Sequence, residues 1–497
     1  MLSKPIESAE ITSLQYYTQP VISSLGFREY DGRWKLPKQL NLLGMQALGL
    51  GFGTQIRNMD IKPRVVVGHD YRKYSESVKM AFMLGLIASG CQVLDIGLSI
   101  SPMAYFAQFD LDAPAIAMIT ASHNPNDWTG AKLGANRPMT HGPEDMKELK
   151  DIVLAGHWKV REGGTWTTIE GEADRYIADL VKGRRINRKL RVVCACGNGG
   201  AAAFAPKALA MIGVEVIPLH AILDHTFPNY NPNPEAEDML MSMVDAVREH
   251  DADCAFGFDG DGDRCGFVDN KGNIIYPDKM GVILAREWAA QYPNARFVAD
   301  VKSTSLFTSD PQLLALGAKT DYCKTGHSYM KRYLNEHDCL AGFERSGHYV
   351  FAPPLGRGYD DGIATALEVC RLLDRYPEKT LSNFFETLDK TWGNIPILPL
   401  CSDKVKYEII EKITDNLEKM AEKVEPFAGR RIESISKING IRVQFQDGAW
   451  VLIRASSNMP NLVVICESPN SSNEMTSILG FVKNLLSTYP EIDISAF

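Results

Sequence analysis

The sequence predicts an α/β fold with three similar βαβ-type mixed-sheet domains, followed by an antiparallel α+β domain at the C-terminus. At 497 residues the chain is too long for a single hydrophobic core. A short strand, an apolar helix, a glycine and a second strand follow one another three times. The C-terminal region instead combines a long amphipathic helix with alternating strands. We therefore expect four domains, at 1–170, 171–278, 279–395 and 396–497.

A charged loop precedes the first repeat. It covers 27–33, and a helix is expected after it, over 37–50. The loop contains Tyr30 and Arg33, and Arg33 by itself would be interpreted as a solvated surface charge.

The three repeated units share a strand that begins with arginine and a glycine that ends the following helix. The strands with their turns cover 64–70, 191–200 and 296–304, and the glycines are Gly90, Gly213 and Gly317. Glycine is the usual residue where a helix stops in the left-handed conformation. Strand, helix and strand in this order predict right-handed βαβ units, which bind ligands at the carboxyl ends of their strands.

The C-terminal domain is predicted from two local patterns. Apolar residues recur on one face of a helix expected over 403–424. Two alternating strands, 441–445 and 450–453, are separated by Asp447-Gly448, which indicates a hairpin.

Composition excludes several classes of protein. The net charge of −8 argues against a general nucleic-acid binder. The ten cysteines are scattered, with one close pair at Cys194 and Cys196, so reduced intracellular thiols are expected. No apolar segment follows Lys4, and the weakly polar stretch 40–52 is interrupted by glycines. We therefore expect a cytoplasmic protein without a signal peptide or a membrane span.

A serine in a stiff loop is the first candidate for chemistry. The loop 120–132 follows an apolar strand, and Pro125 restricts the residues around it. Serine becomes a nucleophile only when a neighbouring group takes its proton or polarises its target, and His123 and Lys132 are the nearby groups. Ser122 is the candidate nucleophile, and a polar turn without chemistry is the alternative.

Three aspartates alternate with glycines in the second unit. Asp259, Asp261 and Asp263 offer hard oxygen ligands that suit Mg²⁺. An EF-hand is excluded, because its sixth position would be Arg264 and its twelfth Asn270. Three neighbouring carboxylates repel one another without a cation, which disfavours a merely acidic turn.

The third unit contains a loop in which Glu344, Ser346 and His348 could bind adjacent hydroxyls of a sugar. A second polar stretch, 324–328, comes earlier in the same unit and contains His327. An ordinary capped loop explains these residues equally well.

In the fourth unit, Arg454 is followed directly by small hydrogen-bonding residues after a strand. Arginine and small donors in a turn suit a phosphate dianion. A polar turn is the alternative here.

Five stretches, taken in order, resemble the α-D-phosphohexomutase superfamily, and most closely its bacterial phosphomannomutase/phosphoglucomutase branch. They are TASHNPNDWTGAK, DGDGDR, KTGHS, ERSGH and RASSNMP. The resemblance covers nearly the whole chain. It implies four domains around a central cleft, with one functional loop from each. It also implies that Ser122 is carried as phosphoserine and that one Mg²⁺ per chain is bound by Asp259, Asp261, Asp263 and a phosphoserine oxygen.

The implied activity is reversible phosphoryl transfer between the 6-phosphate and 1-phosphate of mannose and/or glucose. A hexose 1,6-bisphosphate would be both intermediate and activator, and hexose phosphates would be the partners, without nucleic acid or membrane; the sequence makes no prediction of oligomeric state. Three alternatives remain: a phosphoglucosamine mutase, a phosphosugar phosphatase and a non-catalytic phosphosugar-binding protein.

The resemblance also assigns roles to individual residues. The expected catalytic residues are Arg33, Ser122, His123, Lys132, Arg264 and His327, with Lys132 as the candidate for proton transfer. The expected substrate-binding residues are Tyr30, Lys302, Glu344, Ser346, His348, Arg454, Ser456, Ser457 and Asn458. Ser457 and Asn458 stand where many relatives have Asn and Thr, so the individual phosphate contacts of this loop are open.

Overall fold

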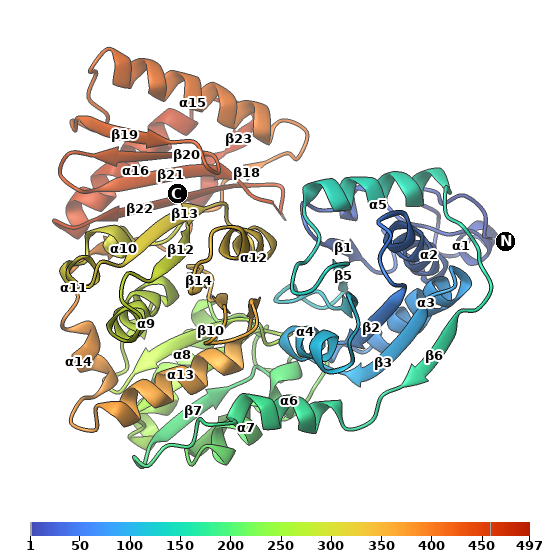
Figure 1. Cartoon of the computed structure of the whole chain (residues 1–497). Helices are drawn as coiled ribbons and strands as arrows, with labels where there is room; N and C mark the ends of the chain where they lie inside the picture. Colours follow the sequence, from blue (N-terminus) through green and yellow to red (C-terminus); the bar gives the residue numbers. More distant parts are fainter. Residues whose placement is uncertain (1, 458) are drawn as a thin grey trace.

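The computed structural model describes residues 2–457 and 459–497, so the predicted site residue Asn458 lies outside the described residues. In this part of the chain there is one sheet of six strands, three of five and one of two. The colours of Figure 1 follow the units from blue on the right, through green at the bottom and yellow, to red at the upper left. The predicted fold class is confirmed: three mixed sheets precede an antiparallel one.

The first unit is built on the six-stranded sheet, in the order β1-β5-β4-β2-β3-β6. Its strands are β1 (Gly32–Lys35), β2 (Arg64–His69), β3 (Gln92–Leu98), β4 (Ala115–Ile119), β5 (Trp128–Gly134) and β6 (Thr165–Thr168). Its helices are α1 (Leu14–Thr18), α2 (Leu42–Asn58), α3 (Ser75–Ala88), α4 (Ser101–Asp110) and α5 (Pro143–Ala155). Strands β2 and β4 are parallel and β4 and β5 antiparallel, so the Ser122 loop connects two neighbouring strands.

The helix predicted over 37–50 has different boundaries. Asn41 caps it by accepting a hydrogen bond from the Gly44 amide at 2.7 Å, so α2 begins at Leu42. The helix continues to Asn58 although it contains several glycines. A Cβ atom at Gly49 would lie 2.0 Å from the Phe82 carbonyl oxygen, so glycine permits close packing of α2 on α3. Arg33 is likewise on strand β1 and buried, not in a solvated loop.

The second and third units each contain a five-stranded sheet. The second has β7 (Arg191–Ala195), β8 (Glu215–Leu219), β9 (Cys254–Phe258), β10 (Cys265–Asp269) and β11 (Ile274–Ile275), with α6 (Glu172–Val181), α7 (Ala205–Met211) and α8 (Glu237–His250). The third has β12 (Arg296–Asp300), β13 (Lys319–Cys323), β14 (Ala341–Phe343), β15 (Tyr349–Phe351) and β16 (Tyr359–Asp360). Its helices are α9 (Pro277–Gln291), α10 (Leu306–Ser309), α11 (Pro311–Ala315), α12 (His327–Glu336), α13 (Gly362–Arg375) and α14 (Leu381–Phe385).

The predicted repeat is confirmed in all three units. The paired strands β2 and β3, β7 and β8, and β12 and β13 are parallel. The glycine before each second strand has a positive φ: 78° at Gly90, 105° at Gly213 and 70° at Gly317. In the third unit the two short helices α10 and α11 replace the single helix of the others.

The fourth unit is the predicted antiparallel α+β domain. Its strands are β17 (Trp392–Gly393), β18 (Leu400–Cys401), β19 (Ile432–Ser436), β20 (Ile441–Phe445), β21 (Trp450–Ala455), β22 (Leu462–Ser468) and β23 (Ile492–Asp493). The long helix α15 spans Lys406–Glu422, within the predicted 403–424, and α16 spans Ser472–Leu486. Strands β20 and β21 form the predicted hairpin, with Gln444 paired to Trp450.

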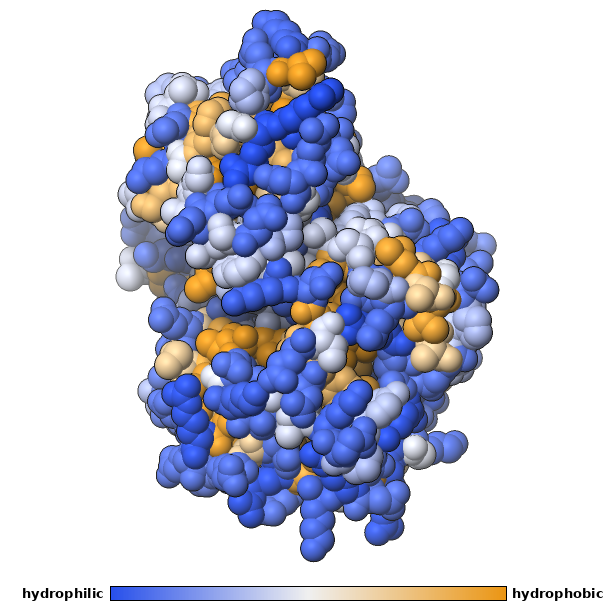
Figure 2. Space-filling view, turned by 90° about the vertical axis from the view of Figure 1, so that its left-hand side faces the viewer, coloured by the Kyte–Doolittle hydropathy of each residue, from blue (hydrophilic) through white to orange (hydrophobic). Residues whose placement is uncertain are grey.

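The hydrophobic cores explain how the units are joined. One continuous cluster includes Phe106 of α4, Phe256 of β9 and Phe343 of β14, so the first three units pack around a shared interior. The fourth unit has its own cluster, which includes Ile413 and Val451. Figure 2 shows a face covered largely by hydrophilic side chains, with apolar ones in smaller groups. The exact boundaries predicted for the four domains remain a prediction.

Two predictions about composition can be compared with the structure. All ten cysteines are buried and free. Among the helices of the described residues, none combines the length and the apolar character that a membrane crossing requires.

Candidate active site

Ser122 lies in a strained backbone conformation in the loop between β4 and β5. Its φ is 51°, in the left-handed region that non-glycine residues seldom adopt. The Ser122 amide donates to Thr120 Oγ1 at 2.8 Å. Arg72 donates to the carbonyl oxygens of Ser122 and Asn124 at 2.9 and 2.6 Å. These bonds hold the candidate nucleophile in a conformation that it would not keep alone.

Asp70 supports the same loop from the end of β2. Its carboxylate accepts a hydrogen bond from Thr120 Oγ1 at 2.8 Å and forms an ion pair with Arg72. Both charged residues are buried. Sequence reasoning did not assign a role to either residue. Their position directly after a predicted strand, at the edge where ligands bind, was the available signal.

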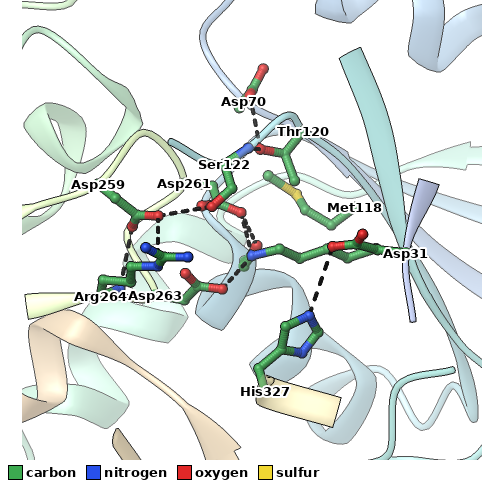
Figure 3. A network of polar contacts seen from close by, with 12 residues as sticks. Asp31, Asp70, Met118, Thr120, Ser122, Asp259, Asp261, Asp263, Arg264 and His327 are labelled. Carbon is green, nitrogen blue, oxygen red and sulfur yellow. Dashed lines mark hydrogen bonds and ion pairs between the residues drawn. The ribbon is translucent and has the colours of Figure 1, made fainter. Parts of the chain in front are cut away.

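The aspartate loop after β9 lies against the serine loop. Ser122 Oγ donates to Asp259 Oδ2 at 3.0 Å, as Figure 3 shows. A Cβ atom at Gly260 would lie 2.6 Å from the Ser122 carbonyl oxygen, so a residue without a side chain is required at this close approach. The two motifs, far apart in the sequence, therefore form one site.

The three aspartates fit a divalent cation. All are completely buried, and a set of their carboxylate oxygens lies within 4.8 Å of one another. Among the described residues, Asp261 Oδ1 and Asp263 Oδ1 have no hydrogen-bond partner. Burial, followed by the charge of Asp261, raises the pKa values of Asp259 and Asp263. Buried carboxylate oxygens without partners are suited to ligate a hard cation.

Lys132 reaches this cluster from β5. Its Nζ atom lies 2.7 Å from Asp261 Oδ2 and also contacts Asp263. Burial opposes its charge, but the neighbouring carboxylates raise the pKa of Lys132 above its usual value. Lys132 likewise lowers the pKa of Asp261, although burial acts in the opposite direction. The lysine is therefore held as an ammonium ion against the aspartates.

His123 and Arg264 flank the serine and its aspartate. His123 Nδ1 is 3.3 Å from Ser122 Oγ, and burial, followed by the charge of Arg264, lowers the pKa of His123 well below its usual value. Arg264 Nε lies 3.8 Å from Asp259 Oδ2. Its Nη1 atom forms an ion pair with Glu235 at 3.1 Å. An imidazole with a lowered pKa is thus placed beside Ser122, and a guanidinium lies beside Asp259.

His327 and Arg33 meet at Asp31. Arg33 forms a 2.9 Å ion pair with Asp31. His327 Nε2 lies 4.0 Å from the same carboxylate, as Figure 3 shows. Burial, followed by the charge of Lys331, lowers the pKa of His327 to about 3. The Tyr30 ring packs closely on the backbone of Gly326, where a Cβ atom would be 2.6 Å from the ring.

The Glu344 loop of the third unit also faces the cavity. Ser346 Oγ donates to Glu344 Oε2 and the Gly326 amide donates to Oε1, both at 3.0 Å. Burial raises the pKa of Glu344. Lys302 Nζ lies 3.7 Å from Asp300. The carboxylate of Glu344 is therefore oriented by two donors before any ligand is present.

The loop after β21 is held by a buried lysine. Arg454 Nη2 donates to Ser457 Oγ at 3.0 Å. Lys406 Nζ donates to the carbonyl oxygens of Ser456 and Met459, the latter at 3.0 Å. Lys406 was not recognised from the sequence, because it appears only as one polar residue near the start of an amphipathic helix.

One cavity of about 520 Å³ joins these loops. The predicted residues that line it are Tyr30, Arg33, Ser122, His123, Lys132, Arg264, Lys302, His327, Glu344, Ser346, His348, Arg454, Ser456 and Ser457. The structure thus brings together the described residues predicted for catalysis and substrate binding, with the aspartates directly behind Ser122. Three further residues line the cavity and were missed: Asn231, Asn233 and Glu235. Their segment is rich in asparagine and proline, which is typical of a polar turn and does not by itself indicate a binding site.

Comparisons with known proteins agree with this arrangement. Models of the phosphoglucomutase/phosphomannomutase α/β/α domains I, II and III match residues 24–159, 174–272 and 276–391. A phosphomannomutase/phosphoglucomutase of Pseudomonas syringae is 32% identical over 96% of this chain and 98% of its own. A phosphoglucomutase of Neisseria gonorrhoeae is 32% identical over 89% of this chain and 92% of its own.

Solved structures show the same similarity. A phosphoglucomutase/phosphomannomutase family protein of Burkholderia thailandensis superposes with a TM-score of 0.83 at 28% identity, over 94% of this chain and 98% of that one. With all three domain models and relatives along nearly its full length, this chain belongs to the phosphoglucomutase/phosphomannomutase family.

Proposed function

We propose that this protein reversibly interconverts the 6-phosphate and 1-phosphate of mannose and/or glucose, through a phosphoserine at Ser122 and a hexose 1,6-bisphosphate. The observation that carries the proposal is the position of Ser122. Its Oγ donates a hydrogen bond to Asp259 at 3.0 Å, and it lines the cavity that the Arg454 loop also lines. A phosphate donor and a second phosphate-binding group in one cavity suit a sugar with two phosphate positions. The names of the relatives, which include both mannose and glucose mutases, support this substrate range.

We assign the divalent cation to Asp259, Asp261, Asp263 and an oxygen of phosphorylated Ser122, and propose Mg²⁺ as the ion. The family is metal-dependent, and the buried carboxylates fit a hard cation. Bound there, the cation would neutralise negative charge on the phosphoryl group.

Phosphoryl transfer depends mainly on positioning and on positive charge around the moving group. Arg264 supplies such charge beside Asp259, and the strained loop presents Ser122 Oγ to the cavity. We propose Lys132 as the group that transfers a proton at the sugar oxygen, with Arg33, His123 and His327 also acting around it.

The remaining residues would bind the substrate. Glu344 and Ser346 would hold adjacent sugar hydroxyls in both orientations, with Tyr30, Lys302 and His348 around them. The Arg454 loop, with Ser456, Ser457 and Asn458, would hold the phosphate that is not reacting. After the first transfer the bisphosphate must turn around, so that its other phosphate returns to Ser122; added bisphosphate would activate by rephosphorylating the serine.

The compartment also belongs to the proposal. Ten buried, unpaired thiols support a reducing environment, and we propose the cytoplasm.

A coupled assay tests the function directly. Purified protein with Mg²⁺ and glucose 1,6-bisphosphate is given mannose, glucose or glucosamine phosphates, and both isomerised product and free inorganic phosphate are measured. We expect turnover of mannose and/or glucose phosphates with little phosphate release. Preference for glucosamine phosphate would favour a phosphoglucosamine mutase, and dominant phosphate release would favour a phosphatase.

A further inference from the structure

A chain of buried polar contacts runs from the third unit to Arg264. Asp360, the last residue of β16, is completely buried, and its Oδ2 atom lies 2.8 Å from Nδ1 of His348. On the other side of the carboxylate, Oδ1 forms a 2.6 Å ion pair with Lys331 Nζ. His348 in turn accepts a hydrogen bond at Nε2 from Arg264 Nε at 3.0 Å.

This arrangement determines which ring nitrogen of His348 carries the hydrogen. The Nε atom of an arginine can only donate, so Nε2 of His348 must be unprotonated to accept from it. In a neutral imidazole the hydrogen is then on Nδ1, where it can be donated to the Asp360 carboxylate. Asp360 and Arg264 therefore require the same tautomer from opposite sides of the ring.

The contact also determines where Arg264 points. Its guanidinium lies between His348 and the carboxylates of Asp259 and Glu235. An imidazole with its hydrogen on Nε2 would place two N–H donors against each other. The hydrogen bond from Arg264 Nε would be lost, and the guanidinium would be displaced.

We propose that Asp360 is a positioning residue that fixes the Nδ1–H tautomer of His348 and through it holds the Arg264 guanidinium beside Asp259 and Ser122. The proposal rests on the mutase function proposed above, because Arg264 is assigned there to stabilise the moving phosphoryl group. Neither Asp360 nor Lys331 was recognised from the sequence. Asp360 is not among the residues that line the cavity, and its hydrogen-bond contact with the cavity lining is through His348.

The ion pair between Lys331 and Asp360 allows the proposal to be tested by substitution. In Asp360→Asn, the ammonium of Lys331, which can only donate, favours the amide oxygen on its own side. The amide nitrogen then faces His348 Nδ1, which must accept, so the ring hydrogen moves to Nε2 and opposes Arg264. In the double variant Asp360→Asn/Lys331→Met this constraint is absent. The amide can then turn its oxygen toward Nδ1 and restore the original tautomer.

The experiment compares kcat, KM and ¹⁵N NMR signals of the His348 ring in wild-type protein, Asp360→Asn and the double variant. For Asp360→Asn we expect kcat to fall about ten- to a hundredfold with a smaller change in KM, because Glu344, Ser346 and the Arg454 loop are untouched and only His348 beside them changes its tautomer. The ¹⁵N signals should show unprotonated Nε2 in the wild type and unprotonated Nδ1 in Asp360→Asn. The double variant should regain at least about threefold in kcat and the wild-type tautomer.

Asp310→Asn is the matched control. Asp310 is also buried and ion-paired, with Arg286, but lies at the start of α11 away from the cavity. It should lower the melting temperature without changing kcat of the folded protein. If Asp360 had only a structural role, Asp360→Asn would lower the melting temperature, but the ring hydrogen of His348 would stay on Nδ1 and kcat of the folded protein would not change.

Wild-type kcat in folded Asp360→Asn, or a hydrogen on Nε2 in the wild type, would overturn the inference. If Asp360→Asn does not fold, a double variant that folds with a hydrogen on Nε2 and lowered kcat would also overturn it. Absence of mutase turnover in the wild type would instead contradict the proposed function, and the NMR signals would still test the tautomer.

Discussion

The ammonium nitrogen of Lys132 lies 2.7 Å from a carboxylate oxygen of Asp261, and both side chains are buried. The lysine comes from β5 of the first unit and the aspartate from the loop after β9 of the second. A divalent cation bound by the three aspartates would compete with the ammonium for the same oxygens. This competition leads to the first prediction.

Lys132→Met should make the protein more dependent on a divalent cation for its stability. Without metal, Asp261 and Asp263 lose their cationic partner, which should lower the free energy of unfolding by roughly 3 kcal/mol. Bound Mg²⁺ should restore most of it. The melting temperature is measured with chelator and across a Mg²⁺ titration. An equal Mg²⁺-induced rise in wild type and variant would show that lysine and metal do not compete.

Ser122→Ala should abolish the covalent step. Its turnover should fall about a thousandfold or more, because the group that carries the phosphoryl has been removed. Intact-mass measurement should find about 80 Da of added phosphate on the active wild type but not on the variant. Near-normal turnover of Ser122→Ala would refute the phosphoserine mechanism.

Arg454→Ala should weaken substrate binding. The loss of a charge-assisted contact of about 1.5–3 kcal/mol should raise KM roughly ten- to a hundredfold. The variant should also release the bisphosphate early, so added glucose 1,6-bisphosphate should restore part of the rate. Arg454→Lys should remain impaired, because lysine cannot make the two-pronged contact. KM and melting temperature are measured on one preparation, and an unchanged KM with a lower melting temperature would indicate a purely structural loop.

Asp361 should make stability depend on pH. Burial raises the pKa of Asp361 from 3.8 to about 7, although it accepts hydrogen bonds from Tyr176 and the Ala364 amide. Between these values the folded protein binds a proton that the unfolded chain lacks, so the free energy of unfolding should fall as pH rises from about 4 to about 7. Asp361→Asn should remove this dependence and stabilise the protein at pH 8 on the order of 3 kcal/mol.

Chemical denaturation at several pH values measures the effect of Asp361. Asp415→Asn, which replaces an exposed carboxylate on α15, is the control and should follow the wild-type curve. Parallel curves for Asp361→Asn and wild type would contradict the assignment.

Much of the architecture could be predicted because its signals are local. The repeated strand, helix and glycine stop at Gly90, Gly213 and Gly317 depend on residues near one another in the chain. The helix around Gly49 was placed incorrectly for the opposite reason. Its continuation depends on close packing against Phe82, which local propensity does not contain.

The sequence alone determined the chemical groups of the candidate site, since a serine loop, alternating aspartates and an arginine loop are short motifs with their own signal. Only the tertiary structure decided how they are held. Arg72 at the Ser122 carbonyl and Asp360 behind His348 are ordinary charged residues in the sequence, and their partners lie on other elements. A contact between distant segments leaves no periodic or local pattern. Its energy arises only when folding buries both groups together and removes the water that would otherwise solvate them.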